Sequence, residues 1–179
     1  MSSSQELGSD PGPLPDEAFP TDPAKYTRTE HFENRAADDD RLVTDELVAN
    51  AIKYGELQSG GEGSWKFVKG ETGLDIHVVC ALGNELDPAV VTAYADVWNG
   101  AKAIINGQFD NRRVKVELFR NVINRPGRFD DRLRTMSLTP AHRVKGHNLK
   151  THSGDWFVEC VDCGKQFHSK DEIVRSDCE

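Results

Sequence analysis

Three cysteines near the C-terminus have the spacing of metal ligands. Cys160 and Cys163 are separated by two residues, and Cys178 follows after fourteen more. Two thiolates at the first spacing fit a tight turn in which both sulfur atoms reach one tetrahedral ion, and Gly164 lets the backbone turn there. Clustered cysteines in a chain with the features of a cytosolic protein favour metal over disulfides. The sequence therefore predicts a structural zinc site with these three cysteines as ligands.

A histidine is expected to supply the fourth ligand, because the remaining cysteine, Cys80, lies within an expected strand. His147, His152 and His168 are all within reach along the chain. We expect His147 first and His152 second, since both precede an expected strand at 155–160 that would bring them back over the cysteine pair. The alternative is that the cysteines are incidental reduced thiols.

The stretch C-V-D-C-G-K that starts at Cys160 resembles the beginning of a two-Cys, two-His zinc finger. It departs from the finger at Ser176, which stands where the first histidine would be. One upstream histidine with Cys178 as the late ligand is more similar to a small zinc-ribbon module. The resemblance implies a zinc-binding module over residues 147–179 that binds DNA, RNA or protein.

A second set of polar residues has the types needed for acid–base chemistry on a phosphate. His31 and Arg35 are four residues apart and would share one face of a helix. His77, and on the next strand Thr92 and Tyr94, would lie on the polar faces of their strands. Imidazole accepts or donates a proton near neutral pH, and guanidinium forms paired hydrogen bonds to phosphate oxygens. The same residues are also common on solvated helix faces and in strands without any function.

Two helices are expected to precede the sheet. Thr29 would cap a short helix that carries His31 and Arg35. Thr44 would cap a second helix that ends at Gly55. The buried stripe of the second helix would consist of Leu47, Val48, Ala51 and Ile52.

Three strand-like segments follow, at 64–69, 74–82 and 89–98, and a fourth strand could lie at 112–119. In the second segment the apolar face is expected to hold Leu74, Ile76, Val78, Cys80 and Leu82. In the third segment it is expected to hold Val91, Ala93, Ala95 and Val97. This order predicts an α+β fold, with two helices followed by an antiparallel sheet of three to four strands and a small C-terminal zinc-binding module.

The composition changes along the chain suggest four regions. Residues 1–25 are expected to be a disordered acidic tail, because five prolines oppose helix and sheet. Residues 26–119 would form the α+β domain and residues 120–146 an irregular basic connector, with one helical turn near Phe129–Leu133. The zinc module would occupy residues 147–179.

The segment from Thr29 to Val97 resembles a family of unknown function that is placed with the RelE-type toxin fold, within the wider barnase-like and EndoU-like group of metal-independent ribonucleases. The resemblance rests on the pair His31-x3-Arg35, on the helix pattern R-x-V-T-x-E-L-V-x-x-A-I that starts at Arg41, on the Gly-Glu pair that follows this helix, and on the stretch V-V-T-A-Y that ends at Tyr94.

This resemblance implies a metal-independent endoribonuclease that leaves a 2′,3′-cyclic phosphate. It implies His31 as the general base or acid, Arg35 as the phosphate clamp, and Thr92 or Tyr94 as a positioning group. His77 would be a reserve acid.

The net charge of −8 is unevenly distributed: residues 1–100 carry −12, residues 101–150 carry +8 and residues 151–179 carry −4. One basic segment in an acidic chain indicates a local anionic partner, so RNA or DNA is expected to contact residues 112–150. The alternative is that these arginines pair with the acidic half of the chain. The acidity would also suit a salt-adapted organism, in which such contacts are screened.

No apolar run approaches the ~20 residues that span a bilayer, and the N-terminus lacks the basic start and apolar core of a secretory signal. We therefore expect a cytoplasmic protein without a membrane partner. Two functions compete at this point. One is an RNA-cleaving, toxin-like enzyme, and the other is a non-enzymatic zinc-containing adaptor that binds DNA, RNA or a protein such as an antitoxin or complex subunit.

Overall fold

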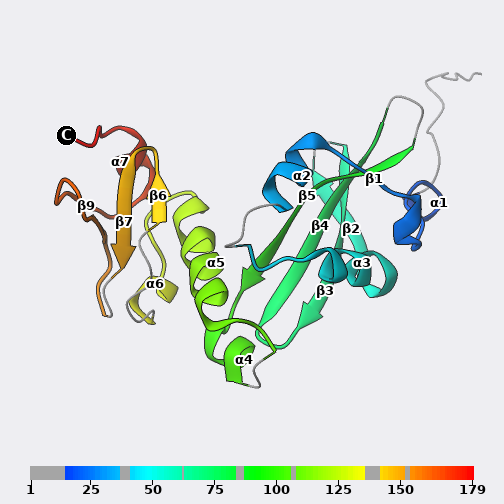
Figure 1. The fold of residues 1–179 in the computed structure, drawn as a ribbon, viewed down its shortest axis with the longest axis horizontal. Coiled ribbons are helices and arrows are strands. Elements are labelled where there is room, and N and C mark those ends of the chain that lie inside the picture. Colours follow the sequence, from blue (N-terminus) through cyan, green and yellow to red (C-terminus); the bar gives the residue numbers. More distant parts are fainter. Residues whose placement is uncertain are drawn as a thin grey trace, which may run out of the picture.

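The computed structural model describes residues 15–36, 41–61, 63–83, 87–105, 108–135, 142–151 and 154–179, without the side chains of residues 15, 16, 35, 36, 135 and 142. These residues form two sheets with helices packed around and between them (Figure 1). The α+β class is confirmed, but the expected pair of helices and three to four strands understate the content.

The first sheet has five strands: β1 (Thr27–Arg28), β2 (Glu56–Gly61), β3 (Ser64–Glu71), β4 (Leu74–Leu82) and β5 (Pro88–Val97). Their order is β1-β5-β4-β3-β2. Strands β2 to β5 form an antiparallel meander, and β1 adds in parallel to β5. The strands predicted at 64–69, 74–82 and 89–98 correspond to β3, β4 and β5. Strand β2 is not among the predicted strands, because its glycines and serine are typical of a turn.

One face of this sheet forms the core of the domain. Four alternate residues of β4 are fully buried: Leu74, Ile76, Val78 and Cys80. Helix α3 (Asp45–Tyr54) covers this face and buries Val48, Ala51 and Ile52. The hydroxyl of Thr44 accepts a hydrogen bond from the backbone N–H of Leu47 at 3.3 Å, so the predicted cap is confirmed. Thr29 caps α2 (Glu30–Ala36) in the same way, accepting from Phe32 at 3.2 Å.

A β-bulge in β5 changes the predicted inner face of that strand. Val79 of β4 pairs with Thr92, whereas the next residue, Cys80, pairs with Val90. Val91 is thus an extra residue, and Val90 takes the buried position beside Cys80 with 2% of its surface exposed. The prediction that Val91 belongs to the inner face is wrong, because strict alternation fails at a bulge. Thr92 and the residues after it keep the predicted sides.

The predicted fourth strand at 112–119 is wrong, because these residues lie in helix α5 (Asn111–Asn124). The Asp110 carboxylate caps the helix by accepting a hydrogen bond from the backbone N–H of Arg113 at 3.0 Å. Apolar residues alternate up to Leu118 as they would in a strand, but the pattern then continues at helical spacing. The buried apolar residues of the helix are Val114, Val116, Leu118, Phe119, Val122 and Ile123.

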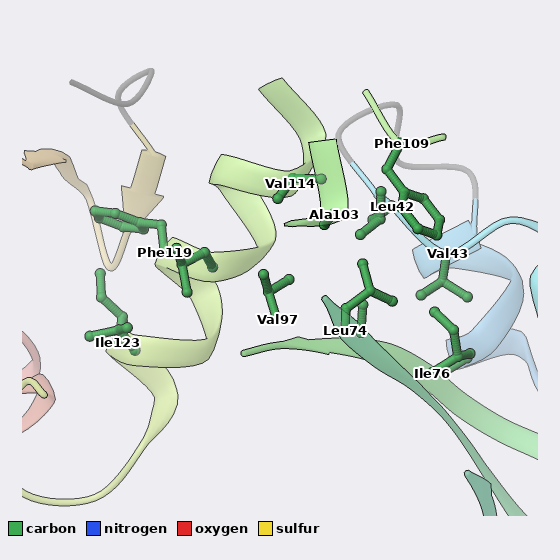
Figure 2. Close-up of a cluster of buried hydrophobic side chains, with 14 of the residues drawn as sticks. Leu42, Val43, Leu74, Ile76, Val97, Ala103, Phe109, Val114, Phe119 and Ile123 are labelled. Atoms are coloured by element: carbon green, nitrogen blue, oxygen red, sulfur yellow. The ribbon is translucent and has the colours of Figure 1, made fainter. Parts of the chain in front are cut away.

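Helix α5 contributes buried residues to both halves of the molecule. Figure 2 shows Val114 on the side of Val97 and Leu74, whereas Phe119 and Ile123 point from the helix toward the C-terminal sheet. The side-chain amide of Asn121 fixes the helix to the free edge of β5. It accepts a hydrogen bond from the N–H of Val97 at 2.8 Å and donates one to the carbonyl of Ala95 at 2.9 Å.

Part of the predicted N-terminal tail is structured. Residues 15–25 contain the short helix α1 (Pro15–Ala18) and the 3-10 turn η1 (Pro23–Lys25). The expectation that prolines exclude helix is wrong here. Pro15 and Pro23 each stand at the first position of their helix, where the missing N–H is not needed. Phe19 is 3% exposed and belongs to the core.

The second sheet holds the cysteine motif. It contains β6 (His142–Val144), β7 (His147–Thr151), β8 (Val158–Cys160) and β9 (Gln166–Phe167), which are antiparallel in that order. Helix α7 (Lys170–Val174) follows and buries Ile173. The sheet starts five residues before the predicted start of the zinc module. We refer to residues 142–179 as the metal module.

Short elements join the two halves. Helix α4 (Gly100–Ile105) precedes α5, and α6 (Arg132–Thr135) lies near the helical turn predicted at Phe129–Leu133. Phe129 and Leu133 are buried, and the N–H of Phe129 donates to the carbonyl of His168 at 3.0 Å. The predicted basic connector at 120–146 therefore begins within α5 and ends beyond β6.

Candidate metal centre and adjoining cleft

Four side chains of the metal module converge on one point. The ligand atoms of His147, Cys160, Cys163 and Cys178 all lie within 4.8 Å of one another. The sulfur atoms of Cys160 and Cys178 are 3.6 Å apart, and the Cys163 sulfur is 3.7 Å from Nδ1 of His147. In a tetrahedral zinc site, bonds of about 2.0–2.3 Å place neighbouring ligand atoms about 3.6–3.8 Å apart. The arrangement is therefore compatible with a metal site.

Local backbone structure positions the two knuckle cysteines. The N–H of Gly164 donates to the carbonyl of Cys160 at 2.8 Å, and the N–H of Cys160 donates to the carbonyl of Lys165 at 2.9 Å. Gly164 has a φ of +75°, a conformation that glycine adopts without strain. The tight turn predicted for the Cys-x2-Cys pair is thus present.

His147 presents its Nδ1 atom to the cysteines. Its Nε2 atom is 2.8 Å from the carbonyl oxygen of Ser176. Because a carbonyl oxygen only accepts, Nε2 carries the proton, and Nδ1 keeps a lone pair for a metal ion. The ring is fully buried and packs edge-on against the Phe167 ring, with the two ring centroids 4.9 Å apart. Lys165 donates to the carbonyl of Asp177 at 2.8 Å and so holds the segment that carries the last cysteine.

The surroundings shift the pKa values of two of the cluster's thiols in opposite directions. Burial raises the pKa of Cys160, but hydrogen bonds from the Cys163 backbone, the His147 ring and two further backbone groups outweigh it and lower the pKa to about 6. Burial and the neighbouring sulfur atoms raise the pKa of Cys178 to about 12. Metal binding would deprotonate the cysteines, and a divalent ion would then balance the charge of the adjacent thiolates.

The four predicted metal ligands, His147 included, are therefore together in space. Four protein ligands leave no open coordination position, which is the pattern of a structural site. Of the alternative histidines, His168 instead lies with its Nδ1 3.7 Å from the carboxylate of Glu172 and its ring near Phe157. His152 lies outside the described residues.

A cleft of about 1070 Å³ lies against the face of the first sheet that is opposite α3. Residues from α2, from three strands, from α5 and from the metal module line it. They are His31, Asn34, Arg41, Lys66, His77, Thr92, Tyr94, Asp96, Glu117, Arg120, Asn121, Ile123, Asn124, Arg125, Arg143 and Val144. Five are lysine or arginine and two are acidic, so the lining is positive in a chain whose net charge is −8.

Strand register explains how the sheet residues meet in the cleft. His77 is directly opposite Tyr94, and Val79 stands between Lys66 on one side and Thr92 on the other. Cross-strand partners share a face, so these side chains form adjacent rows on the polar face. The rings of His77 and Tyr94 stack with centroids 4.7 Å apart and an interplanar angle of 5°.

Two polar atoms in the cleft are buried without a hydrogen-bond partner among the described residues: Nδ1 of His77 and Oγ1 of Thr92. Burial, followed by the Lys66 ammonium, lowers the pKa of His77, and nearby carboxylates offset this only in part. Burial and Asp96 raise the pKa of Tyr94. At neutral pH the cleft therefore presents a neutral imidazole and a neutral phenol.

Both acidic residues of the cleft are neutralised by arginines. Asp96 is paired with Arg125 at 3.2 Å and with Arg132 at 3.4 Å. Glu117 is 1% exposed and lies 3.2 Å from Arg120. Because both carboxylates are engaged by arginines, the histidines are the groups of the cleft best suited to transfer protons.

The cleft collects four of the five predicted catalytic residues, namely His31, His77, Thr92 and Tyr94. The fifth, Arg35, is in α2 one turn after His31, but its side chain is outside the described set. Lys66, Glu117, Arg120 and Arg143 also line the cleft. Lys66 belongs to none of the predicted sites, whereas the other three lie in the segment 112–150 that is expected to contact nucleic acid. Alternation in the strand at 64–69 places Lys66 on the face opposite Phe67, and this pattern would have allowed Lys66 to be predicted on the polar face of the sheet.

Comparison of the chain with protein-family models, with curated proteins and with solved structures finds no significant match. Within the part of the chain that the structure describes, no helix has both the length and the apolar character required to cross a lipid bilayer.

Proposed function

We propose that the protein is a metal-independent endoribonuclease of the RelE-like type, with its active site in the cleft and a structural zinc ion in the metal module. The observation that carries this proposal is the meeting of His31, His77, Thr92 and Tyr94, from three separate elements, in one cleft lined by cations. Ribonucleolytic chemistry without metal needs two proton-transfer groups and a positive surface for the scissile phosphate.

His77 is the proposed general base. Its lowered pKa keeps the imidazole neutral at pH 7, and its unpartnered Nδ1 can accept the proton of the ribose 2′-OH. The 2′-oxygen then attacks the adjacent phosphorus, the bond to the 5′-oxygen breaks, and a 2′,3′-cyclic phosphate forms. His31, on the exposed rim of the cleft, is the proposed acid that protonates the leaving 5′-oxygen.

The remaining residues hold the phosphate and the ribose. Lys66 lies in the same sheet row as Thr92, so an ammonium and a hydroxyl can both reach a phosphate placed over the sheet. Tyr94 fixes the plane of His77 by stacking on it. Arg35 keeps its proposed role as a phosphate clamp, because α2 brings this position to the same side as His31.

The test is cleavage of mixed-sequence RNA by the purified full chain in the presence of EDTA, with retention of bound metal checked by mass spectrometry. His77→Ala and His31→Ala should each lose at least about 100-fold in rate, the usual contribution of a proton-transfer group. His168→Ala is the matched control, because it removes an imidazole outside the cleft. Products should end in a cyclic phosphate. Equal cleavage by all variants, or no cleavage by folded wild type, rejects the proposal.

Zinc is the proposed ion of the metal module, since one nitrogen and three sulfur ligands in a tetrahedron are the preference of Zn²⁺. The purified chain should carry one equivalent of zinc. His147→Ala should lose it, whereas His168→Ala should keep it. Zinc retained by both variants would exclude His147 as a ligand.

A second candidate function is a non-enzymatic adaptor that binds nucleic acid or protein through the metal module. The closed coordination of the cluster favours it, because such a site supplies structure and no chemistry. This reading predicts RNA or DNA affinity that decreases with salt but no turnover. Binding without cleavage by the wild type would favour the adaptor over the enzyme.

A further inference from the structure

The metal module forms part of the wall of the cleft. Arg143 and Val144, both in β6, line the cleft together with residues of the first sheet and α5. Strand β6 is the edge strand of the second sheet, with β7 as its neighbour in the sheet. The position of Arg143 therefore depends on how firmly β6 is held by β7.

A tight turn fixes β6 to β7. Val144 pairs with His147, so only Lys145 and Gly146 connect the strands. Both have positive φ angles, 48° and 81°, which is the signature of a type I′ hairpin turn. Such a turn matches the natural twist of paired strands, and β6 therefore moves with β7 as one hairpin.

The first residue of β7 is a member of the metal cluster. His147 faces Cys163 through Nδ1, and its Nε2–H is bonded to the carbonyl of Ser176. At the turn, the Lys145 ammonium donates to the carbonyl of Val174 at the end of α7. A metal ion that binds His147 and the three cysteines would thus fix the hairpin against the C-terminal segment.

Arg143 is exposed, and no carboxylate within the described ranges forms an ion pair with it. This distinguishes it from Arg120 and Arg125, which face Glu117 and Asp96 in the same cleft. A guanidinium that has no acidic partner among the described residues and lies in a positive cleft is suited to bind a phosphate oxygen.

We propose that the β6–β7 hairpin is a metal-dependent wall of the RNA-binding cleft, in which Arg143 contacts a backbone phosphate and the metal ion positions Arg143 by holding His147. The ligand class, a single RNA strand, rests on the proposed function. The proposed roles of Arg143 and of the metal ion in binding RNA do not depend on whether the RNA is cleaved.

The first test is equilibrium binding of a short fluorescent 2′-O-methyl RNA, which cannot be cleaved because its 2′-oxygen is blocked. With metal-loaded protein, Arg143→Ala should bind more weakly and should reduce the slope of log affinity against log salt by about 0.7, the value for one phosphate contact on a single strand. Arg143→Lys should restore part of the slope. Arg175→Ala, an exposed arginine of the same module that does not line the cleft, should bind as wild type does.

The second test separates the effect of the metal ion on RNA binding from the effect of the Arg143 charge. Metal-free protein, prepared with a chelator, should bind the RNA more weakly, and there Arg143→Ala should cause no further loss. An equal loss with and without metal would show that the ion does not position Arg143. Unchanged binding by metal-loaded Arg143→Ala would overturn the proposal entirely. A failed cleavage assay with intact Arg143-dependent binding would reject only the proposed function.

Discussion

The ring of His77 lies where its neutral form is favoured. It stacks on Tyr94, and burial and the Lys66 ammonium together lower its pKa. We expect Lys66→Met to raise the pKa of His77, because it removes a nearby positive charge and keeps an aliphatic side chain. An NMR titration of the ring protons measures the shift. Lys102→Met removes the same charge near Trp98, away from the cleft, and an equal shift in this control would refute a local effect.

The lowered pKa also has a consequence for stability. The unfolded chain, with an ordinary pKa of about 6.5, binds more protons than the folded protein between the two values. The contribution of His77 to the free energy of unfolding is therefore present above pH ~6.5 and is lost as the pH falls through this window. Lys66→Met should reduce this loss, and urea unfolding on both sides of that pH provides the measurement.

Glu117 links α5 to Arg41 and Leu42 through a single buried charge. It is 1% exposed, lies 3.2 Å from Arg120 and 3.7 Å from Arg41, and accepts a hydrogen bond from the N–H of Leu42. Glu117→Gln should lower the free energy of unfolding by about 3 kcal/mol, because it removes a buried negative charge that lies beside two largely buried guanidinium groups. Glu33→Gln should cost less than about 1 kcal/mol in the same urea experiment, since its pair is exposed. Similar losses in both variants would contradict the argument.

Among the elements, α5 depends on its first turn. Asp110 accepts a hydrogen bond from the N–H of Arg113, and this helix then carries both Asn121 and Glu117 to the cleft. Asp110→Ala should lower the free energy of unfolding by about 1 kcal/mol, the usual value of an N-cap. Asp110→Asn should stay close to wild type, because asparagine caps equally well. A loss of the same size in both variants would show that charge, and not capping, matters there.

The sequence predicts elements best where local signals agree with the tertiary structure. Thr44, Gly55 and the apolar stripe between them define α3, and the alternation of 74–82 defines β4. The strand prediction for 112–119 is wrong because the alternation of apolar residues there is too short to distinguish a strand from a helix. Strand β2 is not predicted because its residues have low strand propensity, and it forms by pairing with β3.

The same distinction applies to the sites. Cys160 and Cys163 are close in sequence, so their role as metal ligands can be predicted without a structure. The choice of His147 over the other histidines depends on the pairing of β7 with β8. His77 and Tyr94 could be placed on one sheet face by alternation alone. The role of Arg143 could not, because it depends on how the second sheet packs across α5.

For the whole molecule, charge is separated in space as well as in sequence. The chain carries −8, yet the cleft has five cationic side chains and two acidic ones. Part of the basic segment at 112–150 lines the cleft through Arg120, Arg125 and Arg143. Another part pairs with acidic residues, as Arg132 does with Asp130 at 3.1 Å. Repulsion from the acidic surface would therefore direct a polyanion to the cleft and away from the rest of the molecule.

The metal module has few apolar residues to hold it together. Among its described residues, the fully buried side chains are His147, Leu149, Thr151, Val158, Cys160 and Ile173, and its strands are two to five residues long. A core of this size rarely stabilises a fold without a metal ion or disulfides. The first sheet, by contrast, has strands of up to ten residues and is contacted by α3 and α5, so we expect it to keep its structure without the metal ion.

Metal removal should therefore unfold one part of the molecule selectively. After chelation, hydrogen exchange followed by mass spectrometry should show rapid exchange in residues 142–179, while β3, β4 and β5 keep their protection. The physical reason is that the binding free energy of a structural zinc ion is also the folding free energy of the segment that supplies its ligands. Added zinc should restore protection, and Cys178→Ser should reproduce the metal-free pattern even with zinc present. Unchanged protection of β7 and β8 in metal-free protein would show that packing against α5 alone holds the module. Loss of protection in β4 as well would show that the two halves fold as one unit.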